Sequence, residues 1–123
     1  MHRLGKLIVG CERSTGASFR SLMLGAYRGD QVVYVGSVGT GFKERQAAQL
    51  QATMDKLPWK RKQPRVLYSG KRDVAWIQPT LIAEIEYLGW TSDEKLRHAS
   101  FKGLREIQDN AGVYRLDIYL HAR

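Results

Sequence analysis

Basic side chains are concentrated in one short stretch of this 123-residue chain. The stretch covers residues 60–72, contains no Asp or Glu, and holds six bases: Lys60, Arg61, Lys62, Arg65, Lys71 and Arg72. Because such side chains neutralise phosphates and release counterions, the cluster is typical of nucleic-acid binding. Trp59 and Tyr68 flank its centre, and aromatic rings can pack on sugars or bases. We predict phosphate binding here; the alternative is a solvated surface loop whose aromatic side chains are anchored in the core.

The net charge of the whole chain supports this prediction. It is +8, and six of these charges belong to the 60–72 stretch. A surplus of this size favours a polyanionic partner, most often nucleic acid and less often an acidic membrane or protein. The alternative is a basic domain that is merely soluble.

Other chemistries find little support in the sequence. The one cysteine, Cys11, excludes an intrachain disulfide framework and a cysteine zinc cluster. Gly36, Gly39 and Gly41 lack the GxGxxG spacing and no Gly-Lys-Ser/Thr follows them, so they indicate a turn between a strand and a helix. No apolar run approaches the roughly 20 residues of a membrane span, so we expect no membrane partner.

The first third of the chain predicts three short strands. They cover residues 4–10, 20–27 and 31–38, which are rich in β-branched and other apolar side chains. Arg28-Gly29-Asp30 is expected to be the tight turn that joins the second strand to the third. The basic stretch follows later and lacks apolar periodicity, so it is expected to be a loop or an extended arm.

An amphipathic helix is expected over residues 43–57, which contain no glycine or proline. Pro58 is expected to end it. Apolar side chains recur there at spacings of three and four, at Ala47, Leu50, Met54 and Leu57. This stripe is interpreted as a core-facing surface rather than as a partner site.

Two or three further strands are expected after the basic stretch. Residues 80–88 alternate apolar side chains with Glu84 and Glu86, which predicts a half-buried strand. Residues 95–106 mix bases with apolar side chains, and residues 113–120 alternate again. The order predicts a mainly β single domain over residues 1–123: an OB-fold, which is a five-stranded Greek-key β-barrel with one α-helix between strands 3 and 4. Other small β-barrels are the alternative.

Several blocks of the sequence resemble, in order, the C-terminal domain of bacterial ATP-dependent DNA ligases. The blocks are LIVG at 7–10, FRSLMLG at 19–25, YVGSVGTGF at 34–42, AEIEY at 83–87 and LRHASFKGLRE at 96–106. The D-type ligases, which act in DNA repair and recombination by non-homologous end joining, look most similar. The resemblance implies an OB-fold, and the residues after about 108 lie outside it.

The last block resembles nucleotidyltransferase motif VI. In this family the basic residues of the motif contact the triphosphate of ATP when the OB domain closes over the adenylation domain, and they orient the departing pyrophosphate. The resemblance assigns this catalytic role to Arg97, Lys102 and Arg105, with Phe101 as a core anchor. The family's ending Arg-x-Asp-Lys is replaced at its last two positions by Ile107-Gln108.

The lysine that ligases adenylate lies in a KxDG motif, which is absent from this sequence; the nearest match, Lys71-Arg72-Asp73-Val74, ends in valine. The resemblance therefore implies that ATP and magnesium act only through a separate adenylation domain, and that the isolated chain holds no cofactor and is inactive alone. The chain is expected to be an excised domain, a subunit that acts in trans, or a truncated relative.

The resemblance implies two partners, an adenylation domain and duplex DNA with nicks or ends, in the bacterial cytoplasm at the nucleoid. We assign the DNA contacts to the six bases of the 60–72 stretch. Their phosphate contacts would fix the position of the domain on DNA and read no sequence. Two other functions fit the same charge. One is a stand-alone, non-enzymatic nucleic-acid-binding OB module, and the other is a barrel that docks on an acidic protein.

Overall fold

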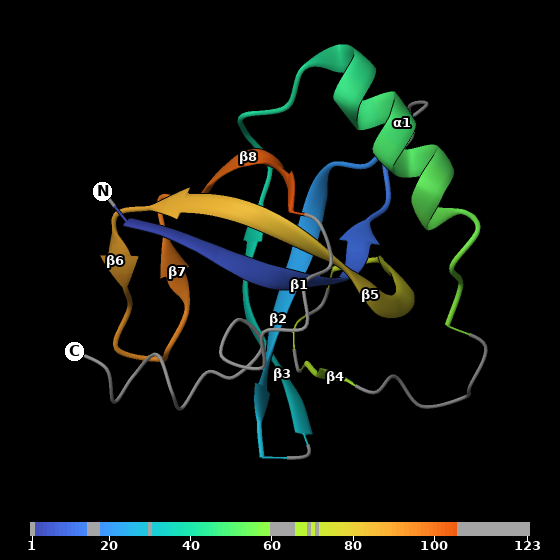
Figure 1. Ribbon diagram of the computed structural model, residues 1–123. Helices are drawn as coiled ribbons and strands as arrows, with labels where there is room; N and C mark the ends of the chain where they lie inside the picture. The colour runs from blue at the N-terminus through green and yellow to red at the C-terminus, as the bar shows by residue number, and fades with distance from the viewer. Residues whose placement is uncertain are drawn as a thin grey trace.

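The computed structural model describes residues 2–14, 18–29, 31–59, 66–68, 70 and 72–105. One sheet is built from β1 (His2–Glu12), β2 (Ser21–Arg28), β3 (Gln31–Val38), β4 (Val66–Leu67), β5 (Val74–Tyr87) and β8 (Ser100–Arg105). A second, two-stranded sheet and one helix complete these elements: β6 (Gly89–Trp90), β7 (Leu96–Arg97) and α1 (Glu44–Met54). Figure 1 shows α1 at one end of the main sheet and the β6–β7 hairpin at another edge.

The order of the main sheet is β4-β3-β2-β1-β5-β8. All of its neighbouring strands are antiparallel except the short β4, which is parallel to β3. The long strands β1, β2, β3, β5 and β8 have α1 between the third and the fourth of them. This arrangement confirms the predicted OB-fold, and β4, β6 and β7 are additions to it. The possible strand at residues 113–120 lies outside the described residues.

The fourth long strand is longer than the sequence indicated. β5 begins at Val74, whereas the predicted strand began at residue 80. Pro79 explains the difference, because a proline has no N–H for the sheet and argues against a central strand. The pairing of β5 with β1 is interrupted there: Leu81 pairs with Ile8 and Trp76 with Gly10, so Pro79 lies in an irregular part of the ladder. The proline is thereby tolerated inside the strand.

The sheet closes where the end of β3 meets β8. The Phe101 N–H donates a hydrogen bond to the Thr40 carbonyl oxygen at 3.0 Å. Gly41, with φ 90°, lies so close that a Cβ atom there would be 2.4 Å from the Phe101 carbonyl oxygen. Gly39 and Gly41 form the predicted turn between a strand and a helix, whereas Gly36 lies inside β3. The close packing against β8 is a further reason for glycine at residue 41.

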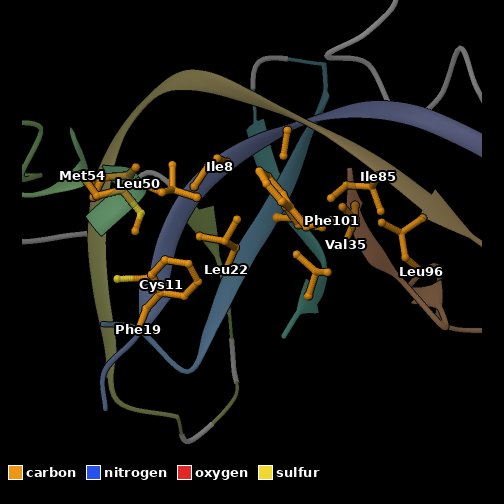
Figure 2. Close-up of a cluster of buried hydrophobic side chains, with 14 of the residues drawn as sticks. Ile8, Cys11, Phe19, Leu22, Val35, Leu50, Met54, Ile85, Leu96 and Phe101 are labelled. Atoms are coloured by element: carbon orange, nitrogen blue, oxygen red, sulfur yellow. The ribbon is translucent and has the colours of Figure 1, made fainter. Parts of the chain in front are cut away.

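The core lies between the inner face of the sheet and α1. Leu50 and Met54 of α1 are buried, and Ala47 and Leu57 pack against the same cluster, so the predicted core-facing stripe is confirmed. Figure 2 shows Leu50 and Met54 entering the cluster beside Ile8. The helix ends at Met54, before the predicted residue 57, because the N–H groups of residues 56 and 57 bond to Thr53 and Met54 in a tighter final turn.

The outer face of the sheet carries a second apolar cluster. Its buried members are Leu7, Val9, Met23, Val32, Val66 and Ile82. Tyr34, Tyr68 and Trp76 pack against it and shield it from solvent. Leu7 and Val9 belong to this cluster while Ile8 belongs to the inner one, as the alternation of side chains along β1 requires. No helix in the described part of the chain is long and apolar enough to cross a membrane.

Candidate functional site

Two of the three bases of the motif VI block lie together on the outer face of the sheet. Lys102 and Arg105 belong to β8, which pairs with β5. Arg105 donates a hydrogen bond from Nη2 to Oε1 of Glu84 at 3.1 Å, and Nζ of Lys102 lies 4.0 Å from Oε1 of Glu86. Both bases are therefore held by carboxylates of the neighbouring strand.

An irregularity in β8 makes this convergence possible. Residues three apart in a regular strand point to opposite faces, so Lys102 and Arg105 would be separated. The register shifts between Glu84 and Ile85, which pair with residues 103 and 101, so Lys102 is an extra residue on β8. Such a bulge re-aims side chains. It brings Lys102 to Glu86 on the same face on which Arg105 contacts Glu84.

Arg3 of β1 joins the same group from the other side of β5. Its Nε donates to Oε2 of Glu86 at 3.3 Å, and its Nη1 lies 4.0 Å from Oε2 of Glu84. Arg3 lies outside the first predicted strand, which was expected to begin at residue 4, whereas β1 begins at His2. The five residues Arg3, Glu84, Glu86, Lys102 and Arg105 are called the charged face below.

The charged face is accessible to a ligand. Its side chains are between 24% and 55% exposed, with Glu86 the least and Arg3 the most. Ion pairs this exposed each contribute only about 0–1 kcal/mol to folding stability. The network therefore orients the cations more than it stabilises the fold, and solvent-borne anions can compete with the two carboxylates.

Arg97, the third base of the motif VI block, lies elsewhere. It is exposed on β7, opposite Gly89 in the β6–β7 hairpin. Within the described part of the chain, no hydrogen bond or ion pair of its side chain joins it to the charged face. The hairpin is attached to the β2–β3 region by an ion pair between Arg28 and Glu94 and by Lys95, whose Nζ lies 5.8 Å from the ring centre of Tyr34.

Phe101 anchors β8 in the core, as expected. Its side chain is 3% exposed, and its ring stacks on that of Phe42 with centroids 4.5 Å apart. Phe101 lies between the β6–β7 hairpin and Lys102 along the chain. Its burial fixes β8, the strand that carries Lys102 and Arg105. The position of the charged face therefore depends on core packing.

The basic stretch is described only in part. Lys60, Arg61, Lys62, Arg65 and Lys71 lie outside the described residues. Arg72 donates from Nη1 to Oγ of Ser37 at 2.6 Å and lies 4.0 Å from Oε1 of Glu12. Val66 and Leu67 form β4 beside β3, so part of this stretch is a strand of the sheet and not the expected loop.

Tyr68, within the basic stretch, packs on the protein, and Trp59, just before the stretch, is attached to β5 through its backbone. The ring of Tyr68 makes edge contacts with Tyr34 and Trp76, at centroid distances of 4.9 and 5.6 Å. The Trp59 N–H donates to the Trp76 carbonyl oxygen at 3.0 Å, which ties its backbone to β5. For Tyr68 this favours the anchored alternative over stacking on bases.

A groove of about 560 Å³ lies between α1 and β8. Gln46, Gln49, Leu50, Phe101 and Leu104 are among its lining residues. Its walls are mostly apolar, and Leu104 is 50% exposed. None of the three motif VI bases lines it, so the groove and the charged face are separate features of the surface.

Metal or thiol chemistry has no support in the described residues. No group of three His, Cys, Asp or Glu side chains there is placed to hold a metal ion. Cys11 is buried, and this burial raises the pKa of its thiol. A buried thiol with a raised pKa is a poor nucleophile, because the thiolate is the reactive form.

Comparison with known proteins decides the family. The family described as ATP dependent DNA ligase C terminal region matches residues 15–108. The chain belongs to this family. The multifunctional non-homologous end joining protein LigD of Mycolicibacterium smegmatis is 35% identical over 98 residues, which are 76% of this chain and 12% of that protein. The protein of the same name from Mycobacterium bovis is 31% identical over 108 residues, 84% of this chain and 14% of that protein.

Solved structures of this ligase family have the same fold. The crystal structure of the ligase domain from M. tuberculosis LigD matches with a TM-score of 0.81 and 26% identity, over 93% of this chain and 38% of that one. A mycobacterial DNA ligase D complexed with ATP and MES matches with a TM-score of 0.77 and 27% identity, again over 93% and 38%. The resemblance to end-joining D-type ligases is thereby confirmed. The chain spans only 12% and 14% of the length of the two curated relatives given above.

Proposed function

We propose that this chain acts as the OB domain of an ATP-dependent DNA ligase of the LigD type, in the bacterial cytoplasm at the nucleoid. Its motif VI bases would engage the triphosphate of ATP held by a separate adenylation domain, which also supplies the magnesium and the lysine nucleophile. The observation that carries this proposal is the convergence of Lys102 and Arg105 on one exposed face, inside the part of the chain that matches the ligase family.

The chemical contribution of these residues is positioning and charge neutralisation. When AMP is transferred to a lysine, the bond between the α- and β-phosphates breaks and negative charge grows on the departing pyrophosphate. Guanidinium and ammonium groups placed beside that charge stabilise the transition state. Arg105 can offer a planar pair of donors, while Lys102 offers a compact point charge. Arg97 would have to approach from the β6–β7 hairpin.

The test is an adenylation assay in trans. The purified chain is added to the adenylation domain of a LigD-type ligase, and labelled AMP on the lysine is measured. We expect the chain to accelerate this step and the Arg105→Gln variant to lose at least about tenfold of the acceleration. The matched control is Arg13→Gln, because Arg13 is also an exposed, ion-paired arginine but its partner is Asp73. Equal acceleration by the wild-type chain and the Arg105→Gln variant would refute the motif VI role.

The second part of the proposal is binding of nicked duplex DNA by the basic stretch. It is supported by the six bases without an acid between residues 60 and 72. Replacing all six with alanine should weaken binding to nicked duplex at low salt by at least about a hundredfold, because most of the phosphate contacts are lost. Fluorescence anisotropy with a labelled nicked duplex measures this. Unchanged binding by this variant would show that the DNA contacts lie elsewhere.

The adenylation assay and the DNA titration together separate the alternative functions. A non-enzymatic nucleic-acid-binding module would bind DNA but would not accelerate adenylation in trans. A barrel that docks on an acidic protein would bind neither nicked duplex nor single strands at low salt.

A further inference from the structure

Arg3 occupies the central position in the charged face. Each glutamate uses its two carboxylate oxygens for two different cations: Glu84 contacts Arg105 through Oε1 and Arg3 through Oε2. Glu86 contacts Lys102 through Oε1 and Arg3 through Oε2. The order along the face is therefore Lys102, Glu86, Arg3, Glu84 and Arg105, and Arg3 is the cation that both carboxylates share.

We propose that Arg3 is a third phosphate-contacting residue for the triphosphate of the nucleotide, and that Glu84 and Glu86 are placeholders for that anion. The two carboxylates hold the three cations in position, and phosphate oxygens replace them when the nucleotide arrives. This inference rests on the proposed function of motif VI and adds to it a residue of β1, far from the motif in sequence.

The geometry favours an exchange of this kind. β1 and β8 flank β5, so the cations on the two outer strands are separated by about two strand spacings, or roughly 10 Å. A triphosphate group has about this length, so it could contact cations on both strands. Carboxylate and phosphate oxygens accept the same donors, and arginine binds both with its planar fork. Arg3 is 55% exposed, so a ligand can reach its guanidinium without rearrangement of the core.

The carboxylates also explain how three cations can lie close together on this face. Three cations on β1 and β8 repel one another across β5, and the two glutamates of β5 between them cancel most of that repulsion. The net charge of the face is only +1, so the face attracts anions weakly while both carboxylates hold the cations. Removing one carboxylate should therefore strengthen anion binding, whereas removing Arg3 should weaken it.

Nuclear magnetic resonance with the whole chain tests these opposite signs. Sodium tripolyphosphate is titrated into nitrogen-15-labelled protein, and the Gly103 amide and the Arg105 Nε–Hε signal are followed. These local signals are needed because the basic stretch is also proposed to bind anions, and a bulk method would not separate the two sites. At Gly103, Arg3→Gln should weaken the apparent affinity about two- to fivefold. Glu86→Gln should strengthen it by a similar factor. Arg13→Gln, the matched control, should leave it unchanged.

The possible outcomes are distinct. If Arg3→Gln leaves the titration unchanged while Arg105→Gln weakens it, the role of Arg3 is wrong and the proposed function stands. If neither variant changes the titration, the motif VI assignment fails as well. If both Arg3→Gln and Glu86→Gln weaken binding, the network is structural and the exchange is refuted. A charged face that responds to nicked duplex DNA but not to tripolyphosphate would also overturn the inference.

Discussion

At the scale of single residues, the charged face depends on a glycine outside it. Gly41 follows β3 with φ 90°, and a Cβ atom there would lie 2.4 Å from the Phe101 carbonyl oxygen and 2.8 Å from its nitrogen. Both atoms belong to the backbone of β8, so the side chain could be accommodated only by moving that strand. The strand in turn carries Lys102 and Arg105. A residue of the β3–α1 turn thus fixes the site.

We expect Gly41→Ala to destabilise the fold by about 2–5 kcal/mol, since it combines backbone strain with overpacking against β8. Gly29→Ala is the matched control: Gly29 also has a positive φ, 61°, but nothing lies within 4 Å of the position of its Cβ atom. It should cost only about 1–2 kcal/mol. Urea unfolding measures both, and equal losses would mean that the contact with β8 is unimportant.

At the scale of elements, the sequence predicted what periodicity and composition control. Three strands, the helix and its buried face follow from the spacing of apolar residues, and Glu84 and Glu86 were recognisable as one polar face of a strand. The bases of the charged face could not be recognised from periodicity or composition. Lys102 and Arg105 have the wrong spacing to share a face of a regular strand, and only the resemblance to ligases singled them out.

Elements that are defined by tertiary contacts could not be predicted from the sequence. β4 is two residues long and exists through its pairing with β3, in a stretch whose composition indicates a loop. The bulge in β8 becomes apparent only when its register with β5 is known. Arg3 became a candidate because the partners of Glu84 and Glu86 come from β1, more than 80 residues earlier. Long-range pairing of this kind leaves no local pattern.

At the scale of the whole molecule, the charge is divided unevenly between the basic stretch and the charged face, for which we propose different tasks. The basic stretch carries six of the eight net charges, whereas the charged face has three bases and two acids and is nearly neutral. Six bases in a stretch without Asp or Glu would bind a polyanion through release of counterions, which depends steeply on salt. The long-range attraction of a nearly balanced face for an anion is small, so ligand binding there should depend on salt much less.

The two ligands should therefore respond differently to ionic strength. If all six bases of the stretch contact phosphates, the logarithm of the affinity for nicked duplex should fall with a slope of about −5 against the logarithm of salt concentration, a loss of about a thousandfold between about 50 and 200 mM. Tripolyphosphate binding, read at the Gly103 amide, should fall far less over the same range. The variant with six alanines serves as the control, because its slope for DNA should be close to zero. A wild-type slope for DNA shallower than about −2 would contradict this division of charge, since the basic stretch would then make too few phosphate contacts to be the principal DNA-binding surface.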